Sequence, residues 1–262
     1  DPTPFAGVNV VLEAFHTHIQ ALLQGHFLGM YLVGSLALGD FDPSSSDIDF
    51  VVVTNTDLAG GLVRGLAEIH AQFAASPSPW ATRIEAVYIP RAALRTHATA
   101  TRQYPQIEKG TTLAPAALED GWVFQCWTLR ERGLVVAGRT PGELVAPIQA
   151  REMHAAVAAI AGGWADAARH DPAWLDWLRH RPHHAFVVQT LCRMLYSLAT
   201  GAVTSKPRAI EWAQQALGTP WSTFIQRSLA ARHEAGPLTQ SEVDDTVAFI
   251  HYTLERSQRE AT

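Results

Sequence analysis

Apolar residues recur every three or four positions between Gly7 and Gly25, near the start of the chain. This spacing places them on one face of a helix. They are Val8, Val11, Leu12, Phe15, Ile19, Leu22 and Leu23. Two apolar runs follow, over residues 27–33 and 48–53, and each has the length and the turn-forming flanks of a buried strand. The polar, glycine-bearing stretch between the two runs predicts a loop.

Helical and strand patterns continue to alternate through the first half of the chain. The further elements expected there are helices over 58–75 and 118–132 and strands over 83–89 and 134–137. A stretch rich in glycine and proline, 138–147, then interrupts the pattern. We therefore predict a first domain over residues 1–147, with a small mixed sheet and several helices.

The pattern changes after this break, because every periodic segment has helical spacing and none reads as a strand. The expected helices cover 152–168, 185–200, 207–217, 221–232 and 241–256. A second domain over residues 148–262 is predicted to be a helical bundle. The predicted fold class is thus α/β plus all-α.

Charge and composition narrow the function. The chain has a formal net charge of -5 and a pI near 6.2, which disfavours non-specific binding to nucleic acid or to an anionic membrane. No apolar run approaches the roughly 18 residues of a membrane span, and the start Asp1-Pro2-Thr3-Pro4 lacks a signal pattern. The two cysteines, Cys126 and Cys192, have no metal-ligand spacing. These features favour a cytoplasmic protein, expected as a monomer, without a nucleic-acid or membrane partner.

Two carboxylates mark the candidate site. Asp47 and Asp49 lie two positions apart on a predicted strand, so both side chains point to the same face. Such a pair repels itself unless a cation neutralises it, and Mg²⁺ is held by one or two carboxylates together with substrate phosphates. Gly34 and Ser35 directly follow the preceding strand, where a missing Cβ and a hydroxyl beside backbone amides suit phosphate oxygens. The arrangement predicts Mg²⁺ and a nucleoside triphosphate.

Glu85 is the candidate for a third carboxylate ligand of the metal, because it interrupts an otherwise apolar strand. If this strand pairs beside the Asp47/Asp49 strand, Glu85 faces the metal site and is placed to act as a general base on an acceptor hydroxyl. The alternative is that Glu85 is merely an exposed strand residue.

These motifs resemble the nucleotidyltransferase superfamily, and the chain as a whole is similar to the aminoglycoside 3″/9-adenylyltransferases, which modify streptomycin and spectinomycin. The similarity extends to 130–138, to 187–197 and to the segments around Ser205-Lys206 and Glu211-Trp212-Ala213. Together these segments span most of residues 28–258.

The resemblance implies a set of functional residues. Ser35, Ser46, Asp47 and Asp49 would form the nucleotide and Mg²⁺ site, with Glu85 as the base and Arg193 and Lys206 binding the triphosphate. The reaction would transfer AMP from ATP to a hydroxyl of a small aminoglycoside or aminocyclitol. An enzyme for an unrelated metabolite, or a nucleotide-binding regulator without antibiotic-modifying activity, is the alternative.

The segment before Val187 departs from the family. Where streptomycin-modifying members carry a tryptophan and acidic residues, this chain has Arg179-His180-Arg181-Pro182-His183-His184-Ala185-Phe186, which reverses the local charge. Spectinomycin is therefore the first choice of acceptor. The histidines have no cysteine or Glu-x-x-His partner, which favours a solvated or substrate-facing loop over a zinc site.

Lysine is scarce, since only two of the 20 basic residues are lysines, Lys109 and Lys206. Lys206 opens a predicted helix next to Ser205 and Pro207, and a helix start with a cation beside it attracts phosphate. Lys109 lies in a charged loop. We therefore expect Lys206 to matter more for ATP binding.

Overall fold

The computed structural model describes residues 1–96 and 102–259. The chain divides into two compact units, Asp1–Ile148 and Gln149–Thr262. This division falls one residue after the boundary expected from the sequence. Each unit is described by itself below.

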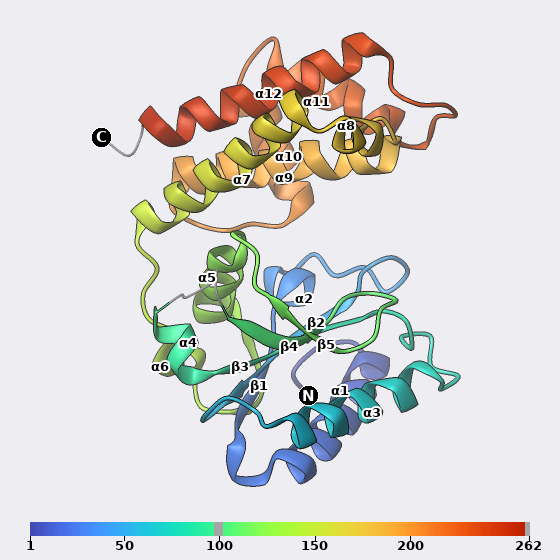
Figure 1. Cartoon of the computed structure of the whole chain (residues 1–262), viewed down its shortest axis with the longest axis vertical. Coiled ribbons are helices and arrows are strands. Elements are labelled where there is room, and N and C mark those ends of the chain that lie inside the picture. Colours follow the sequence, from blue (N-terminus) through green and yellow to red (C-terminus); the bar gives the residue numbers. More distant parts are fainter. Residues whose placement is uncertain (97–101, 260–262) are drawn as a thin grey trace. The chain divides into compact units, whose positions relative to one another are not determined.

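The first unit is built around a six-stranded mixed sheet with the strand order β5-β4-β3-β2-β1-β6 (Figure 1). Its strands are β1 (Phe27–Leu32), β2 (Ile48–Thr54), β3 (Ile84–Pro90), β4 (Gln103–Ile107), β5 (Ala114–Ala117) and β6 (Leu134–Gly138). Only β2 and β3 run parallel, and every other neighbouring pair is antiparallel. The expectation of a small mixed sheet is confirmed.

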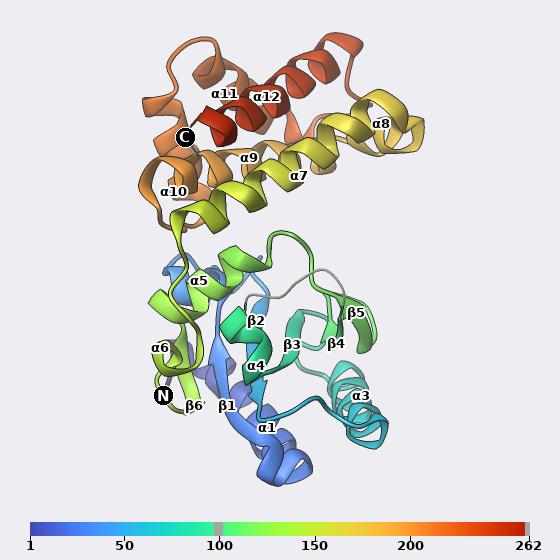
Figure 2. The same cartoon turned by 60° about the vertical axis from the view of Figure 1, so that its left-hand side comes forward.

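Helices cover both faces of this sheet (Figure 2). They are α1 (Ala6–Leu23), η1 (Gln24–His26), α2 (Gly34–Leu38), α3 (Gly60–Ala74), α4 (Arg91–Thr96), α5 (Trp122–Arg132) and α6 (Pro141–Leu144). One core contains apolar residues of α1 and α3 together with Ile48, Phe50 and Val52. A second core contains residues of α4, α5 and α6 together with Val51 and Val53. Odd and even positions of β2 therefore face different layers, as strand geometry requires.

Strands β4 and β5 do not appear in the sequence prediction, because each carries a proline. Pro105 and Pro115 lie opposite each other in the antiparallel β4–β5 pair. A proline has no N–H to donate, so this pair must be one whose backbone groups point away from each other. Accordingly, the pairing of β3 with β4 includes Ile107 and Gln106 but stops short of Pro105.

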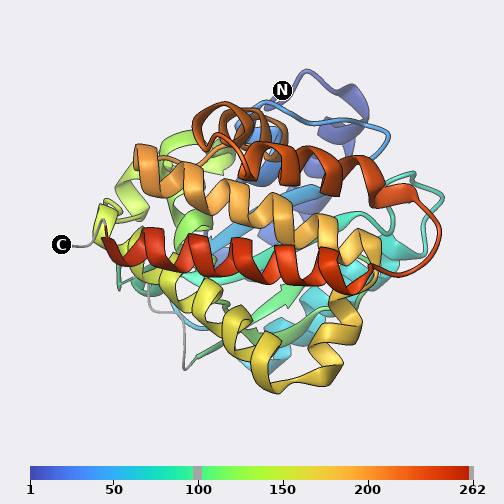
Figure 3. The same cartoon turned by 90° about the horizontal axis from the view of Figure 1, so that it is seen from above.

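The second unit contains only helices within its described residues, and the expectation of a helical domain is confirmed. They are α7 (Ala150–His170), α8 (Pro172–Leu178), α9 (Arg181–Thr200), α10 (Lys206–Ala216), α11 (Trp221–Ala230), η2 (Ala231–His233) and α12 (Gln240–Arg259). Helix α12 packs along α7 and α9 (Figure 3). In the described parts of the chain, no helix combines the length and apolar character needed to cross a membrane.

Two local expectations were wrong. Residues 34–38 were predicted as loop but form the short helix α2, which ends at Gly39 in the left-handed conformation. Residues 181–184 were also predicted as loop but form the first turn of α9. There, Pro182 occupies a position where the helix needs no backbone N–H donor, so the proline starts the helix instead of breaking it.

Candidate functional site

Asp49 and Glu85 lie side by side at the beginning of the two parallel strands. The register of β2 and β3 pairs Asp49 directly with Glu85. Paired residues on neighbouring strands share a face and lie roughly 5 Å apart. Both side chains are only partly buried, whereas Ile48 and Phe50 beside Asp49 are fully buried. The strand of Glu85 is therefore the neighbour of the Asp47/Asp49 strand, which is the condition for Glu85 to face the Asp-x-Asp motif.

Gly34 allows the Asp49 carboxylate to pack against the chain where β1 passes into α2. A Cβ at Gly34 would overlap Oδ2 of Asp49, and the backbone there has φ +58. The backbone N–H of Val33 also donates to the carbonyl of Asp49 at 3.0 Å. Both the conformation and the close approach favour glycine. Ser35 follows as the second residue of α2, so the predicted Gly-Ser element adjoins the carboxylates.

A tight turn brings the chain to Asp47. The carboxylate of Asp42 accepts hydrogen bonds from the Ser44 backbone N–H and hydroxyl and from the Ser45 hydroxyl. These bonds, that from the Ser44 backbone first, lower the pKa of Asp42. The Ser46 hydroxyl accepts from the Asp42 N–H at 3.0 Å. Ser46, predicted in the nucleotide site, thus lies beside Asp47 and also closes this turn.

Two cations contact the Asp47 carboxylate. Lys109 Nζ lies 2.9 Å from Oδ1 of Asp47, and Arg83 Nε lies 3.7 Å from the same oxygen. The guanidinium of Arg83 also donates to the carbonyls of Pro43 and Ser46. Lys109 was missed as a site residue, because its charged loop gave no sign that it returns to the Asp-x-Asp motif.

Lys109 sits in the hairpin turn between β4 and β5. The Thr111 N–H donates to the carbonyl of Glu108 at 3.0 Å, and Gly110 has φ +74. A hydrogen-bonded turn with a positive φ at its third residue is a type II turn, which glycine accommodates. A glycine after a charged residue, at the end of a strand, was the available signal for this turn.

The fit of a metal ion can be judged from these contacts. Within residues 1–96 and 102–259, no three His, Cys, Asp or Glu side chains are grouped so that they could hold a metal. Two adjacent carboxylates, Asp49 and Glu85, are present, while Asp47 is engaged by Lys109. Because Mg²⁺ is usually held by one or two carboxylates, waters and substrate phosphates, not by an all-protein cage, this donor set fits Mg²⁺ that arrives with a triphosphate.

Arg193 and Lys206 belong to the second unit. Arg193 lies on α9, and Lys206 is the exposed first residue of α10. Ser205 occupies the N-cap position of α10, without a side-chain cap hydrogen bond, and Pro207 follows in the first turn. The helix start at Lys206 therefore forms as expected, while the role of both cations in phosphate binding stays a prediction.

Comparisons with known families match both units. A nucleotidyltransferase domain model matches residues 19–76, which include Gly34, Asp47 and Asp49. A model described as the aminoglycoside adenylyltransferase C-terminal domain matches residues 143–256. The second unit thus matches the aminoglycoside adenylyltransferases, and the first unit matches nucleotidyltransferases in general. The chain is an enzyme of the nucleotidyltransferase type.

Aminoglycoside adenylyltransferases are similar to this protein along most of the chain. The aminoglycoside (3'') (9) adenylyltransferase of Klebsiella pneumoniae is 25% identical over 243 residues, covering 89% of this chain and 88% of that protein. The protein of the same name from Escherichia coli is 25% identical over 245 residues, covering 89% of both chains. A crystal structure of the spectinomycin adenyltransferase AAD(9) from Enterococcus faecialis with ATP and spectinomycin has the same fold, with a TM-score of 0.66 and 15% identity over 94% of this chain and 98% of that one.

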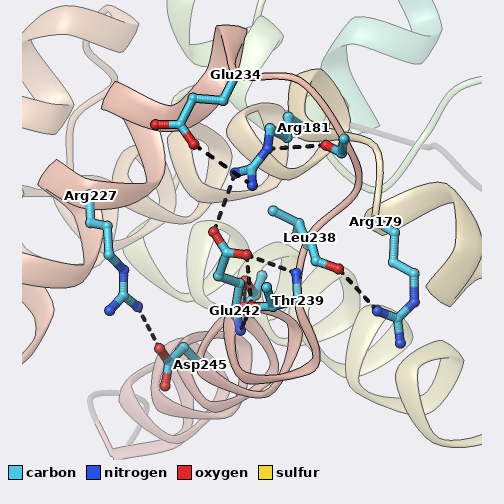
Figure 4. Close-up of polar contacts among 10 residues, drawn as sticks. Arg179, Arg181, Arg227, Glu234, Leu238, Thr239, Glu242 and Asp245 are labelled. Carbon is cyan, nitrogen blue, oxygen red and sulfur yellow. Dashed lines mark hydrogen bonds and ion pairs between the residues drawn. The ribbon is translucent and has the colours of Figure 1, made fainter.

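The arginines just before and at the start of α9 have structural partners (Figure 4). Arg181 is buried and donates to the Gly236 carbonyl at 3.1 Å and to Glu242 Oε1 at 3.2 Å. Arg179 donates to the Leu238 carbonyl at 3.2 Å, while the Leu238 N–H donates to the Arg179 carbonyl at 2.9 Å. These arginines therefore tie the start of α9 to the segment before α12 and to the first turn of α12.

The neighbouring histidines contact aromatic rings. His183 stacks on Trp177 with ring centroids 4.5 Å apart, and its Nδ1 lies 2.8 Å from the Trp177 carbonyl. His184 is buried against Phe224, and this burial lowers its pKa to about 4. Trp177 and Phe186 are the large aromatic side chains exposed on this surface. These histidines thus belong to the packing of α8, α9 and α11.

Proposed function

We propose that this enzyme transfers AMP from ATP to a hydroxyl of an aminoglycoside or aminocyclitol, in a reaction that depends on Mg²⁺. The observation that carries the proposal is the direct pairing of Asp49 with Glu85 beside Gly34. Two neighbouring carboxylates on one face destabilise each other unless a cation lies between them or one carboxylate takes up a proton. A reaction in which one carboxylate accepts the proton of a hydroxyl beside a metal-bound triphosphate supplies both the cation and the proton.

The residues of the first unit would divide the reaction among them. Asp49 and Asp47 would hold Mg²⁺, which when bound neutralises the triphosphate and stabilises the leaving pyrophosphate. Glu85 would accept the proton of the acceptor hydroxyl as its oxygen forms a bond to the α-phosphorus. The bond between that phosphorus and the pyrophosphate oxygen breaks, so AMP is transferred and pyrophosphate leaves. Gly34 and Ser35 would supply backbone amides to the phosphate oxygens.

The donor is proposed as ATP by similarity to the adenylyltransferases, and the matched structure with bound ATP agrees with this choice. Arg193 and Lys206 would neutralise part of the triphosphate charge. For the acceptor, spectinomycin is the first choice, because a segment with Arg179 and Arg181 offers no carboxylate to a strongly cationic streptomycin. The related enzymes are named for both positions of modification, 3'' and 9.

Pyrophosphate release tests this proposal. The purified full chain is incubated with ATP and each of a panel of acceptors, including spectinomycin and streptomycin, with Mg²⁺ and with EDTA. We expect release that needs both Mg²⁺ and spectinomycin. Release with none of the antibiotics, but with a cell metabolite extract, would assign the enzyme to another substrate. ATP binding without any release would support a nucleotide-binding regulator.

A further inference from the structure

Lys109 contacts the carboxylate of Asp47, which is one of the proposed metal ligands. Its ammonium lies 2.9 Å from Asp47 Oδ1. We propose that Lys109 is the counter-ion of Asp47 in the free enzyme and that a divalent cation displaces it in order to bind. This inference rests on the proposed function, because it takes Asp47 as a metal ligand.

Lys109, not Arg83, is the cation that can leave. Arg83 is fixed by its hydrogen bonds to the carbonyls of Pro43 and Ser46, and its guanidinium lies 4.5 Å over the ring of Trp80. It is also only 16% exposed. The side chain of Lys109 is 51% exposed and ends a flexible stem. Hydration therefore offsets much of the free energy lost when Lys109 leaves Asp47.

This competition would make metal binding depend on the nucleotide. A divalent cation that enters alone must replace an ammonium and gains few new ligands. One that enters with a triphosphate brings phosphate oxygens as further ligands. Lys109 would thus weaken the binding of free metal and keep Asp47 in an ion pair until the nucleotide arrives. It is a positioning residue for Asp47.

Direct metal titration tests this role without any turnover. Mn²⁺ binding to the full chain is followed by electron paramagnetic resonance, in the absence of nucleotide and acceptor. Lys109→Met should tighten Mn²⁺ binding by about threefold to tenfold, because it removes both the competing cation and its repulsion. Lys109→Arg keeps the charge and should bind Mn²⁺ within about twofold of the wild type.

Arg102→Met is the matched control. Arg102 pairs with Asp57 in the same unit and its side chain is 59% exposed. The Arg102→Met substitution removes an equal charge from a similar ion pair outside the site, so Mn²⁺ binding should change by less than about twofold. Equal Mn²⁺ affinity in Lys109→Met and Arg102→Met would overturn the proposal.

The two lysines allow a second measurement on the unmodified enzyme. Acetylation by acetic anhydride is followed by mass spectrometry at Lys109, with Lys206 as the internal reference. Mn²⁺ should raise the acetylation rate of Lys109 relative to Lys206, since the displaced amine is no longer paired. A ratio that does not respond to Mn²⁺ overturns the proposal. Pyrophosphate release, measured separately, decides whether the proposed function itself fails.

Discussion

Two charged regions of this protein are organised in opposite ways. At the start of β2 and β3, carboxylate lies next to carboxylate, because Asp49 pairs with Glu85. At the start of α9, Arg181 contacts Glu242 and the backbone carbonyl of Gly236. Each arginine of this region contacts an opposite charge or a backbone carbonyl, whereas Asp49 and Glu85 place like charges on neighbouring strands. Charge alone therefore says little about function until the partners of each charge are known.

The largest effect is expected at Asp49. Asp49→Asn should lower pyrophosphate release by at least about 10³-fold, because a metal ligand at the site of phosphoryl transfer is lost. The variant should still fold, because asparagine has nearly the volume of aspartate, and a cooperative thermal transition checks this. Asp57→Asn, which alters the exposed pair with Arg102, is the matched control and should remain active. A fully active Asp49→Asn enzyme would contradict the assignment of this site.

Glu85→Gln separates the two neighbouring acids. An amide cannot take the proton of the acceptor hydroxyl, so transfer should fall by about 10²- to 10⁴-fold. ATP binding, measured by equilibrium dialysis, should stay near the wild-type value because the Asp-x-Asp motif is intact. If Glu85 were only an exposed strand residue, the turnover rate would be unchanged.

Arg181→Met should affect stability in the other region. The arginine side chain is 10% exposed and that of Glu242 is 21% exposed, so its removal leaves a partly buried carboxylate without its partner. We expect a loss of about 2 kcal/mol in the free energy of unfolding, measured with urea. Arg227→Met breaks the exposed pair with Asp245 and should cost less than about 0.5 kcal/mol. Equal losses would show that burial does not distinguish the two pairs.

A smaller effect near neutral pH is expected from one buried histidine in each unit. Burial lowers the pKa of His184, and likewise that of His70, from 6.5 to about 4. The unfolded chain therefore takes up protons below pH 6.5 that the folded chain does not, and stability falls as the pH drops from 6.5 towards 4. The loss is on the order of 3 kcal/mol at most for each histidine.

His184→Leu tests this difference. Its free energy of unfolding, measured by urea at pH 7, 6 and 5, should depend less on pH than that of the wild type. His70→Leu does the same for the first unit, where His70 Nε2 lies 2.7 Å from the Tyr88 hydroxyl. A pH dependence unchanged in both variants would rule out the two histidines as its source. Burial raises the pKa of Glu242, but hydrogen bonds from Thr239 and Arg181 outweigh it, so the pKa lies below 4.5. Protonation of Glu242 therefore affects stability at a lower pH than protonation of the histidines.

The sequence predicted the elements whose apolar spacing is regular. Helix α1 and strands β1, β2 and β3 appear close to the expected bounds, because burial on one face imposes a period on the residues. The sequence predicted that Glu85 faces Asp49 only if their two strands are neighbours. The residues of a single strand do not determine which strand pairs with it.

The missed features depend on contacts between distant residues. Lys109 contacts Asp47 across 62 positions, a separation set by the β4–β5 hairpin. Arg181 finds Glu242 in the same way, through a segment much later in the chain. Local spacing carries no information on such partners, and a charge in a loop looks the same whether it is solvated or paired.

The proline pair of the β4–β5 hairpin also bears on how chains meet one another. β5 lies at one edge of the sheet, and the outward-facing position of Pro115 offers no N–H to a further strand. Another chain therefore cannot extend the sheet at this edge without leaving a carbonyl unpaired. Pro115 thus protects the hairpin that carries Lys109 against strand-to-strand aggregation. The same proline is the reason why the sequence of β5 does not read as a strand.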